Sequence, residues 1–284
     1  MLRIACSVFW PRNTQNETRM NPTRIKLTIA YDGTHYAGWQ TQKVGLGVQQ
    51  KIEEALAKLF PSQPRLHSSS RTDTGVHALG MIAHFEVPSE QFKMTPAKLA
   101  LALNAWLPHD IRIFNAAKAG KDFHARFDAT RKQYRYFVWN HPATNPLLSH
   151  TAWHVTRRLD LSAMRSAAPL FVGRHDFRSF AAASGQERTT TVRTLNRCDF
   201  KRNGSLITFT IEADGFLYRM CRGIVGTLVQ VGLGKFAPQQ IRHMLAKKDR
   251  RLAGMSAPAH GLVLWKVYYG RKSGARTQES EAGK

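Results

Sequence analysis

Residues 24–32 read Arg-Ile-Lys-Leu-Thr-Ile-Ala-Tyr-Asp, and the fold is most directly inferred from this segment. Apolar side chains occupy every second position from Ile25 to Tyr31, and the polar Lys26 and Thr28 lie on the other face. Because successive side chains of a β-strand point to opposite faces, this alternation predicts a strand with one buried face. The glycine that follows Asp32 predicts a turn at the end of the strand.

The same pattern returns in the second half of the chain. Ile29-Ala30-Tyr31-Asp32-Gly33 with Tyr36 is matched by Ile211-Glu212-Ala213-Asp214-Gly215 with Tyr218. In both copies a predicted strand ends at Asp-Gly, and a tyrosine stands three residues after the glycine. Similarity of this kind indicates an internal repeat. We therefore expect two pseudo-symmetric halves with a cleft between them.

Other segments alternate like strands or carry apolar residues at helical spacing. Strands are expected at 81–87, 111–114, 134–139, 207–213 and 262–269, and helices near 48–59, 96–106, 160–170, 220–231 and after Pro238. The strands are too numerous for a parallel sheet with intervening helices, which favours an α+β fold with largely antiparallel sheets and helices on one face. The expected boundaries are a disordered extension at 1–23, halves at 24–120 and 121–270 joined near Gly120, and a disordered tail at 271–284.

The charge balance is strongly basic. The chain has 42 Lys and Arg against 19 Asp and Glu, a formal net charge of +23. The basic residues recur from Arg24 to Lys272 instead of gathering in one tail. Such an excess favours a polyanionic partner, because each neutralised phosphate releases counterions. Nucleic acid fits this distribution better than an anionic membrane does.

Three cysteines, Cys6, Cys198 and Cys221, are too few and too scattered for a disulfide framework or a zinc cluster. Reduced thiols in a cytoplasmic protein are the simpler interpretation. No apolar run has the length that a bilayer requires. Residues 1–10 are followed by a polar stretch and not by a small-residue cleavage site, so no signal peptide is expected. A role of the basic extension in organelle targeting stays open.

The densest polar segment is residues 68–78, Ser-Ser-Ser-Arg-Thr-Asp-Thr-Gly-Val-His-Ala. It lies between two predicted strands, so it is expected to be a loop that the scaffold presents. Gly75 permits a tight turn, and neighbouring hydroxyl and N–H groups can hold the carboxylate of Asp73. Arg71 can stabilise the ionised form of that carboxylate and contact phosphate. The alternative is an Asx-turn in which Asp73 only caps the loop.

Other chemistries fit the sequence less well. Asp73-Thr74-Gly75 also occurs in aspartic peptidases, but those enzymes need a second carboxylate from a second such motif, and the chain has only one. There is no Walker loop, no His-Glu-x-x-His and no Cys-x-x-Cys, so no metal ligand or nucleotide site is predicted. His67, His77, His84 and His124 are interpreted as members of polar networks or as RNA contacts.

The segment Ser70–Ala78 resembles the signature of the TruA family of tRNA pseudouridine synthases, which often has glycine at Ser70 and alanine at Thr74. Further blocks resemble the family in its order, over nearly the whole of 24–269: Tyr31–Gln40, Val48-Gln49, Asn104–Ile111, Asp122–Phe127, Tyr134-Arg135-Tyr136, His175-Asp176-Phe177, Phe216–Arg222 and Pro258–Leu262.

The resemblance implies a role for five residues. Asp73 would be the essential carboxylate, as nucleophile on sugar or base or as a base, and Arg222 would pair with it across the cleft. Tyr134 would stack on the target base, Leu262 would lie beneath that base, and Arg71 would fill the stack that a flipped nucleotide leaves. Arg222 could instead face phosphate, and Tyr134 and Leu262 could be plain core residues.

The resemblance also implies the partner and the reaction. The family isomerises uridine to pseudouridine in the anticodon stem-loop, at positions 38–40 of the tRNA, and works as a homodimer. The isomerisation needs no cofactor and no metal, and no membrane partner is implied. A non-catalytic RNA-binding protein on the same scaffold is the alternative, although binding alone would not require the Asp73 carboxylate beside phosphate.

Overall fold

The computed structural model describes residues 22–183 and 190–270. The tail predicted at 271–284 lies outside the described residues, and so does the predicted extension apart from Pro22 and Thr23, which belong to the first strand. The first half contains β1 (Pro22–Tyr31), α1 (Val48–Leu59), β2 (His67–Ser68), β3 (His77–Pro88), α2 (Pro96–Trp106) and β4 (Ile111–Lys118). The second half contains β5 (Ala129–Asn140), β6 (Trp153–Val155), α3 (Leu161–Ala167), β7 (Gly173–Asp176), β8 (Val192–Asn203), β9 (Leu206–Ala213), α4 (Met220–Gly232), α5 (Gln240–Lys247) and β10 (Leu262–Tyr269).

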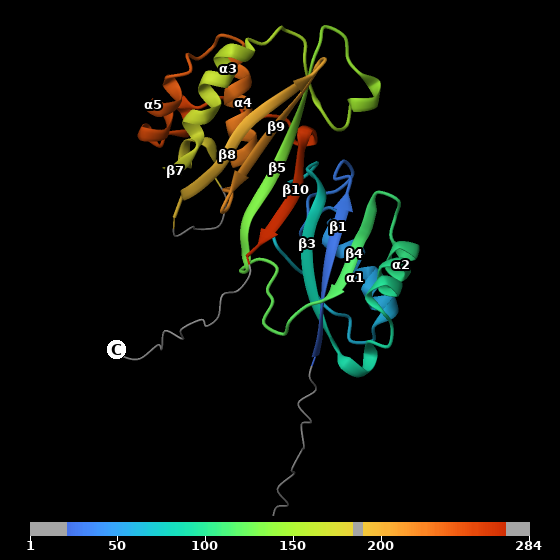
Figure 1. The fold of residues 1–284 in the computed structure, drawn as a ribbon. Coiled ribbons are helices and arrows are strands. Elements are labelled where there is room, and N and C mark those ends of the chain that lie inside the picture. The colour runs from blue at the N-terminus through green and yellow to red at the C-terminus, as the bar shows by residue number, and fades with distance from the viewer. Residues whose placement is uncertain (1–21, 184–189, 271–284) are drawn as a thin grey trace, which may run out of the picture.

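The strands of both halves form one continuous sheet. Its order is β4-β1-β3-β10-β5-β9-β8-β7, with β2 paired to β3 and β6 paired to β5 (Figure 1). Neighbours along this order are antiparallel except β3 and β10, which run parallel where Val263 and Leu264 face His77 and Ala78. The last strand of the chain therefore joins the two halves. This confirms an α+β fold with a largely antiparallel sheet, although the halves share one sheet.

The alternation at 24–32 produces β1 as predicted. Ile25, Leu27 and Ile29 are fully buried and pair in register with Phe85, Ala83 and Met81 of β3. Full burial of each such aliphatic side chain contributes about 1.5–3 kcal/mol. Helix α1 covers this face, because the ring of Phe60 directly after the helix packs 6.0 Å from the ring of Phe85.

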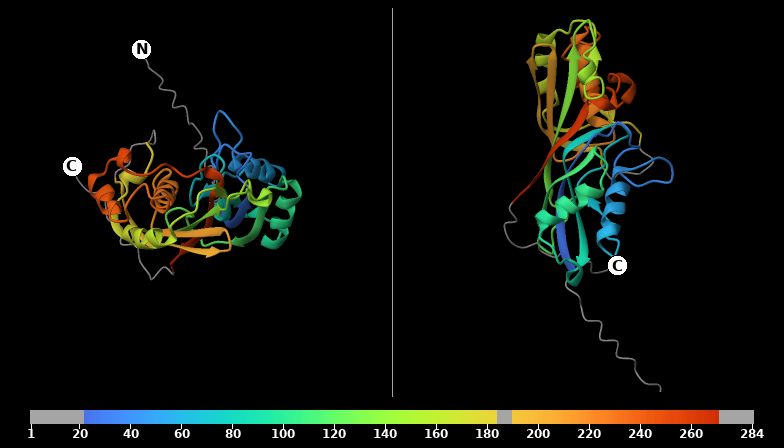
Figure 2. Two further views of the ribbon diagram at one scale, coloured as in Figure 1. Left: turned by 90° about the horizontal axis from the view of Figure 1, so that it is seen from above. Right: turned by 90° about the vertical axis from the view of Figure 1, so that its right-hand side faces the viewer.

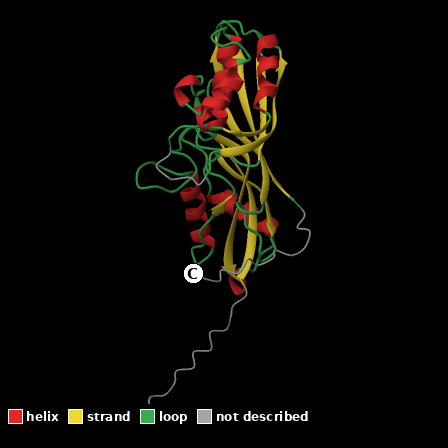
Figure 3. Ribbon diagram, turned by 90° about the vertical axis from the view of Figure 1, so that its left-hand side faces the viewer, coloured by secondary structure: helices red, strands yellow, loops and turns green. Residues whose placement is uncertain are grey.

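The second half is built around β5, β9 and α4. Tyr134 and Tyr136 share one face of β5 and pair with Ile211 and Phe209 of β9. Figures 2 and 3 show the helices packed against the sheet. Helix α4 is almost wholly buried. Its Gly226 approaches the chain so closely that an added Cβ would lie 1.8 Å from the Met255 carbonyl oxygen. Gly226 therefore permits the close packing of this helix against the segment at Met255.

Candidate active site

A cavity of about 1360 Å³ opens where the two halves meet. Its wall comes from the loop between β2 and β3, the start of β5, the segment that leads into α4, and the first residue of β10. Four of the residues singled out in the sequence line it with Asp73, namely Arg71, Tyr134, Arg222 and Leu262. Among the described residues of the wall, Asp73 is the one carboxylate.

The loop that carries Asp73 is fixed by its own backbone and by the residues before it. The Val76 N–H donates to the Asp73 carbonyl at 3.1 Å, and Gly75 has a φ of +73°, a region that favours glycine. The Trp39 N–H donates to the Thr72 carbonyl at 3.1 Å. Gly38 allows this approach, because a Cβ there would lie 2.6 Å from that carbonyl oxygen.

A buried pair of hydroxyl groups anchors the same loop to β1. The Tyr31 Oη and Thr72 Oγ1 atoms are 2.7 Å apart, and both side chains are almost completely buried. Burial raises the pKa of Tyr31 far above its ordinary value, so this phenol stays neutral. The strand predicted at 24–32 therefore positions the residue directly before Asp73.

Arg222 reaches Asp73 from helix α4 of the other half. Its Nη1 lies 3.3 Å from Asp73 Oδ2, and the two side chains are 12% and 20% exposed. Its Nε donates to the Ala257 carbonyl at 2.7 Å, which fixes the guanidinium in place. Burial raises the pKa of Asp73 above the ordinary carboxyl value, while the charge and hydrogen bond of Arg222 and the charge of Arg219 oppose that rise. The pair thus favours the ionised form of a carboxylate whose pKa burial raises.

Arg71 lines the cavity but makes no ion pair with Asp73 in the described part of the chain. The contact that the sequence spacing favoured for Arg71 is made by Arg222 instead. Arg71 is an exposed residue of the cavity wall. Arg219, which the sequence did not single out, adds a second positive charge near the carboxylate.

Tyr134 and Leu262 form the wall opposite the loop. The Tyr134 Oη lies 3.3 Å from Ser70 Oγ, and its ring meets that of Phe216 edge to face at 4.9 Å. Burial raises the pKa of Tyr134 well above its ordinary value, so the phenol is neutral at physiological pH. Leu262 pairs with Tyr136 across the β10–β5 ladder and lines the same cavity. Both side chains are buried like core residues and also border the cavity.

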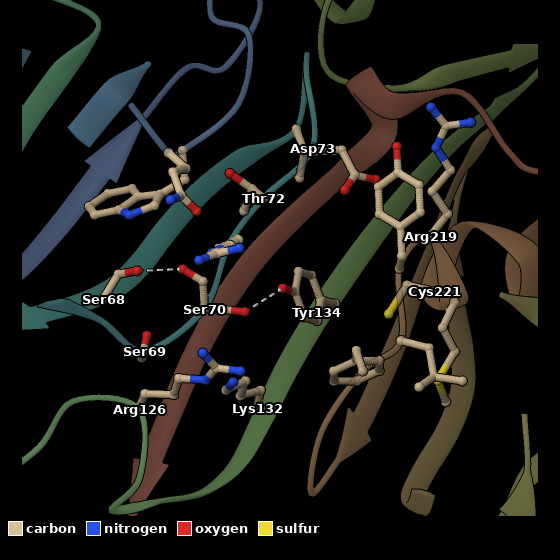
Figure 4. A pocket seen from close by; sticks show the side chains of 18 of the residues that line it. Ser68, Ser69, Ser70, Thr72, Asp73, Arg126, Lys132, Tyr134, Arg219 and Cys221 are labelled. Carbon is tan, nitrogen blue, oxygen red and sulfur yellow. Dashed lines mark hydrogen bonds between the residues drawn. The ribbon is translucent and has the colours of Figure 1, made fainter. Parts of the chain in front are cut away.

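Three basic residues lie toward the other end of the cavity. Figure 4 shows Arg126 and Lys132 together, below Tyr134 and away from Asp73. Arg193, at the start of β8, lines the same space. Lys132 could have been found from the sequence, because it shares the strand face of Tyr134. Arg193 carried no such signal.

Three of the histidines form a cluster beside the cavity. The ring centroids of His67 and His84 are 5.2 Å apart, and those of His84 and His124 are 4.8 Å apart. Burial and the neighbouring imidazoles lower the pKa of His84 to about 4. Its Nδ1 accepts the Ala125 N–H at 3.2 Å. These contacts agree with the predicted polar network. Within residues 22–183 and 190–270, no group of three or more His, Cys, Asp or Glu side chains is placed to hold a metal ion.

A peptidase-like pair of carboxylates is not formed in the described residues. Asp32 lies outside the cavity wall, where its Oδ1 accepts the Thr34 N–H at 2.9 Å. Asp214 accepts the Thr194 N–H at 3.1 Å, also outside the wall. Asp73 therefore shares the cavity wall with basic side chains and with no second carboxylate among the described residues.

The described helices include none that is long and apolar enough to cross a membrane.

Comparison with known proteins gives consistent relatives. A family model described as tRNA pseudouridine synthase matches residues 27–128 and 167–270. The tRNA pseudouridine synthase A of Bacillus subtilis is 44% identical over 248 residues, which cover 87% of this chain and 99% of that protein. The proteins of the same name from Syntrophotalea carbinolica and Acetivibrio thermocellus are 46% and 43% identical over 86% of this chain, and 96% and 99% of their own lengths are covered.

Proposed function

We propose that this chain, which belongs to the tRNA pseudouridine synthase family, uses Asp73 as its essential carboxylate to isomerise uridine to pseudouridine in tRNA. The observation that carries the proposal is the position of Asp73. Among the described residues it is the one carboxylate in the wall of a cavity otherwise rich in basic side chains, and it is paired with Arg222.

The chemistry of the reaction fits a lone ionised carboxylate. The N1–C1′ bond breaks, the base turns, a C5–C1′ bond forms, and the C5 proton leaves while N1 gains one, so nothing is oxidised or reduced. A carboxylate serves such a sequence as nucleophile or as base. Arg222 keeps Asp73 ionised and oriented before the substrate arrives. In this scheme Tyr134 stacks on the target base, and Leu262 packs beneath it.

A uridine within a base stack has to leave it to meet Asp73 in the cavity. Arg71 is exposed at the cavity, and its planar guanidinium suits the place that the flipped base vacates. The net charge of +23 supports binding of the remaining RNA through phosphates and 2′-hydroxyls. The resemblance to the TruA family supports the finer part of the proposal, which is action at positions 38–40 of the anticodon stem-loop by a cytoplasmic homodimer.

The alternative is a protein that binds RNA on this scaffold without catalysis. A carboxylate in the wall of a cavity rich in basic side chains lowers the affinity for phosphate, so pure binding gives no reason to keep it. The pairing of Asp73 with Arg222, which resists the rise in pKa that burial brings, favours a chemical role.

Unmodified tRNA transcripts tritiated at uridine C5 test the proposal directly. Wild-type protein is expected to release tritium without added metal or nucleotide, whereas Asp73→Asn is expected to release none and to bind tRNA about as tightly. Asp199→Asn is the matched control, because Asp199 pairs with Arg197 on β8 and does not line the cavity. Release by Asp73→Asn, or loss of binding as large as the loss of turnover, would refute the role of Asp73.

A further inference from the structure

We infer that Lys132, Arg126 and Arg193 form a phosphate subsite in the cavity, which holds the RNA backbone phosphate one nucleotide from the target uridine. The inference rests on the proposed function, since it takes the uridine to lie between Tyr134 and Asp73.

The position of Lys132 sets the distance from the target. Lys132 stands two residues before Tyr134 on β5, so both side chains project from the same face of the strand. Two strand residues span about 6.6 Å, a length comparable with one step along an unstacked RNA strand. Figure 4 shows Asp73, Tyr134 and Lys132 in succession along the cavity, with Arg126 beside Lys132. A strand with its base on Tyr134 therefore passes its next phosphate over Lys132.

The basic side chains around Lys132 lack ion pairs in the described part of the chain. Within residues 22–183 and 190–270, neither Lys132 nor Arg126 forms an ion pair with a carboxylate, whereas Lys51, Arg131 and Arg197 each do so elsewhere. Partial burial and the charges of Arg126 and Arg193 lower the pKa of Lys132 to about 8. Like charges gathered without an ion pair to a carboxylate among the described residues raise the energy of the unliganded site, and a bound anion lowers it.

The cations come from three separate elements and converge on one space. Arg193 is held by its own strand end, where Nη1 donates to the Val192 carbonyl at 2.6 Å. Arg126 stands on a turn fixed by His124, whose Nδ1 accepts the Arg126 N–H at 3.1 Å. Convergent guanidinium and ammonium groups suit the several acceptor oxygens of a phosphate.

A neighbouring ring favours a nucleotide over a free anion. Phe127 follows Arg126 on the same turn, lines the cavity, and is 68% exposed. Proteins that bind single-stranded nucleic acid combine an exposed aromatic side chain, on which a base stacks, with basic side chains that contact the backbone. The subsite therefore takes the phosphate of a nucleotide chain.

A double-mutant cycle, which combines removal of a positive charge from the protein with removal of a negative charge from the RNA, tests the subsite. Stem-loop RNAs carry one uncharged methylphosphonate, either on the 5′ or on the 3′ side of the target uridine or far from it. Each is measured with wild type, Lys132→Gln, Arg126→Gln and the exposed control Lys201→Gln, for both Kd and the rate of tritium release. One adjacent methylphosphonate is expected to weaken wild-type binding about tenfold and to have almost no further effect in Lys132→Gln.

The methylphosphonate and Lys132→Gln could instead weaken binding independently, so that their effects on Kd multiply at both adjacent linkages. This result would show that Lys132 contacts neither phosphate and would overturn the inference. An equal loss at every linkage, or inhibition of wild type by millimolar inorganic phosphate with no coupling to the RNA modification, would overturn it too. Because Kd is also measured in an Asp73→Asn background, the result does not depend on turnover. Coupling in Kd without tritium release by wild type would refute the proposed function and leave the subsite standing. Lys132→Arg checks folding, since it keeps the charge and is expected to retain the coupling.

Discussion

The Arg222 guanidinium lies 3.3 Å from the Asp73 carboxylate, although the two residues are 149 positions apart in the chain. Arg222 belongs to a helix of the second half and Asp73 to a loop of the first. The parallel contact of β3 with β10 brings these elements together, because it connects the two halves within one sheet. The ionisation state of the cavity carboxylate therefore depends on the docking of the two halves.

Removing Arg222 is expected to shift the pH profile of turnover. Burial already raises the pKa of Asp73, and Arg222 opposes that rise, so Arg222→Gln raises this pKa further. A carboxylate that reacts in its ionised form then loses activity at higher pH as the solution is acidified. When tritium release is measured between pH 5 and pH 8.5, the acidic limb of the profile should have its midpoint at a higher pH than in wild type. Arg222→Lys keeps the charge and should move it less, and an unmoved limb in Arg222→Gln would contradict the role of the pair.

The hydroxyl pair of Tyr31 and Thr72 is expected to position Asp73 without contacting the RNA. Thr72→Val leaves the buried Tyr31 hydroxyl without its partner, which costs about 1–3 kcal/mol of stability. We expect kcat to fall several-fold while Kd for tRNA stays near the wild-type value. Thr72→Ser restores the hydroxyl and should restore kcat. If Thr72→Ser behaves like Thr72→Val, the methyl contact matters and the hydrogen bond does not.

Binding of tRNA is expected to weaken as the pH rises through about 8. The pKa of Lys132 is lowered to about 8 in the free protein by burial, Arg126 and Arg193, and a bound phosphate raises it again. The complex therefore holds a proton that the free protein loses above this pH, so affinity declines as the pH increases. Kd measured at pH 7 and pH 9 should differ for wild type and much less for Lys132→Arg. Equal pH dependence in the two proteins would place the titrating group elsewhere.

Local features of the structure were predictable from the sequence. The alternation from Ile25 to Tyr31 predicted β1, because the period of two is a property of the strand itself. The glycine and hydroxyl residues of segment 68–78 predicted a loop, and residues 69–76 form the loop that carries the cavity carboxylate. The predicted bounds were too wide, because Ser68 ends β2 and β3 begins at His77, four residues before Met81. Such inferences need only neighbouring residues.

Features that depend on distant contacts were not accessible in this way. Spacing favoured Arg71 as the partner of Asp73, since no local pattern indicates that residue 222 folds against residue 73. That contact was expected from the family resemblance alone. The convergence of Arg126, Lys132 and Arg193 had no signal in the sequence, because the three come from a turn and two strands. The continuous sheet was hidden for the same reason, since β10 pairs with a strand nearly two hundred residues earlier.

The close packing of α4 predicts that one methyl group will affect both stability and turnover. A Cβ at Gly226 would lie 1.8 Å from the Met255 carbonyl oxygen, and backbone cannot move aside as a side-chain end can. Overpacking of this kind costs about 1–3 kcal/mol. Gly120→Ala is the matched control, because a Cβ at Gly120 meets nothing within 4 Å, and its cost should stay within about 0.5 kcal/mol.

The same substitution should also reach the active site. Met255 stands two residues before Ala257, whose carbonyl accepts the Arg222 Nε–H at 2.7 Å. A displaced 255–257 segment withdraws this acceptor and loosens the guanidinium that holds Asp73. Gly226→Ala should therefore turn over more slowly than wild type even at temperatures where denaturant titration shows it fully folded. Full turnover with lowered stability would mean that the Ala257 contact is dispensable and that the chain from Met255 to Ala257 serves packing alone.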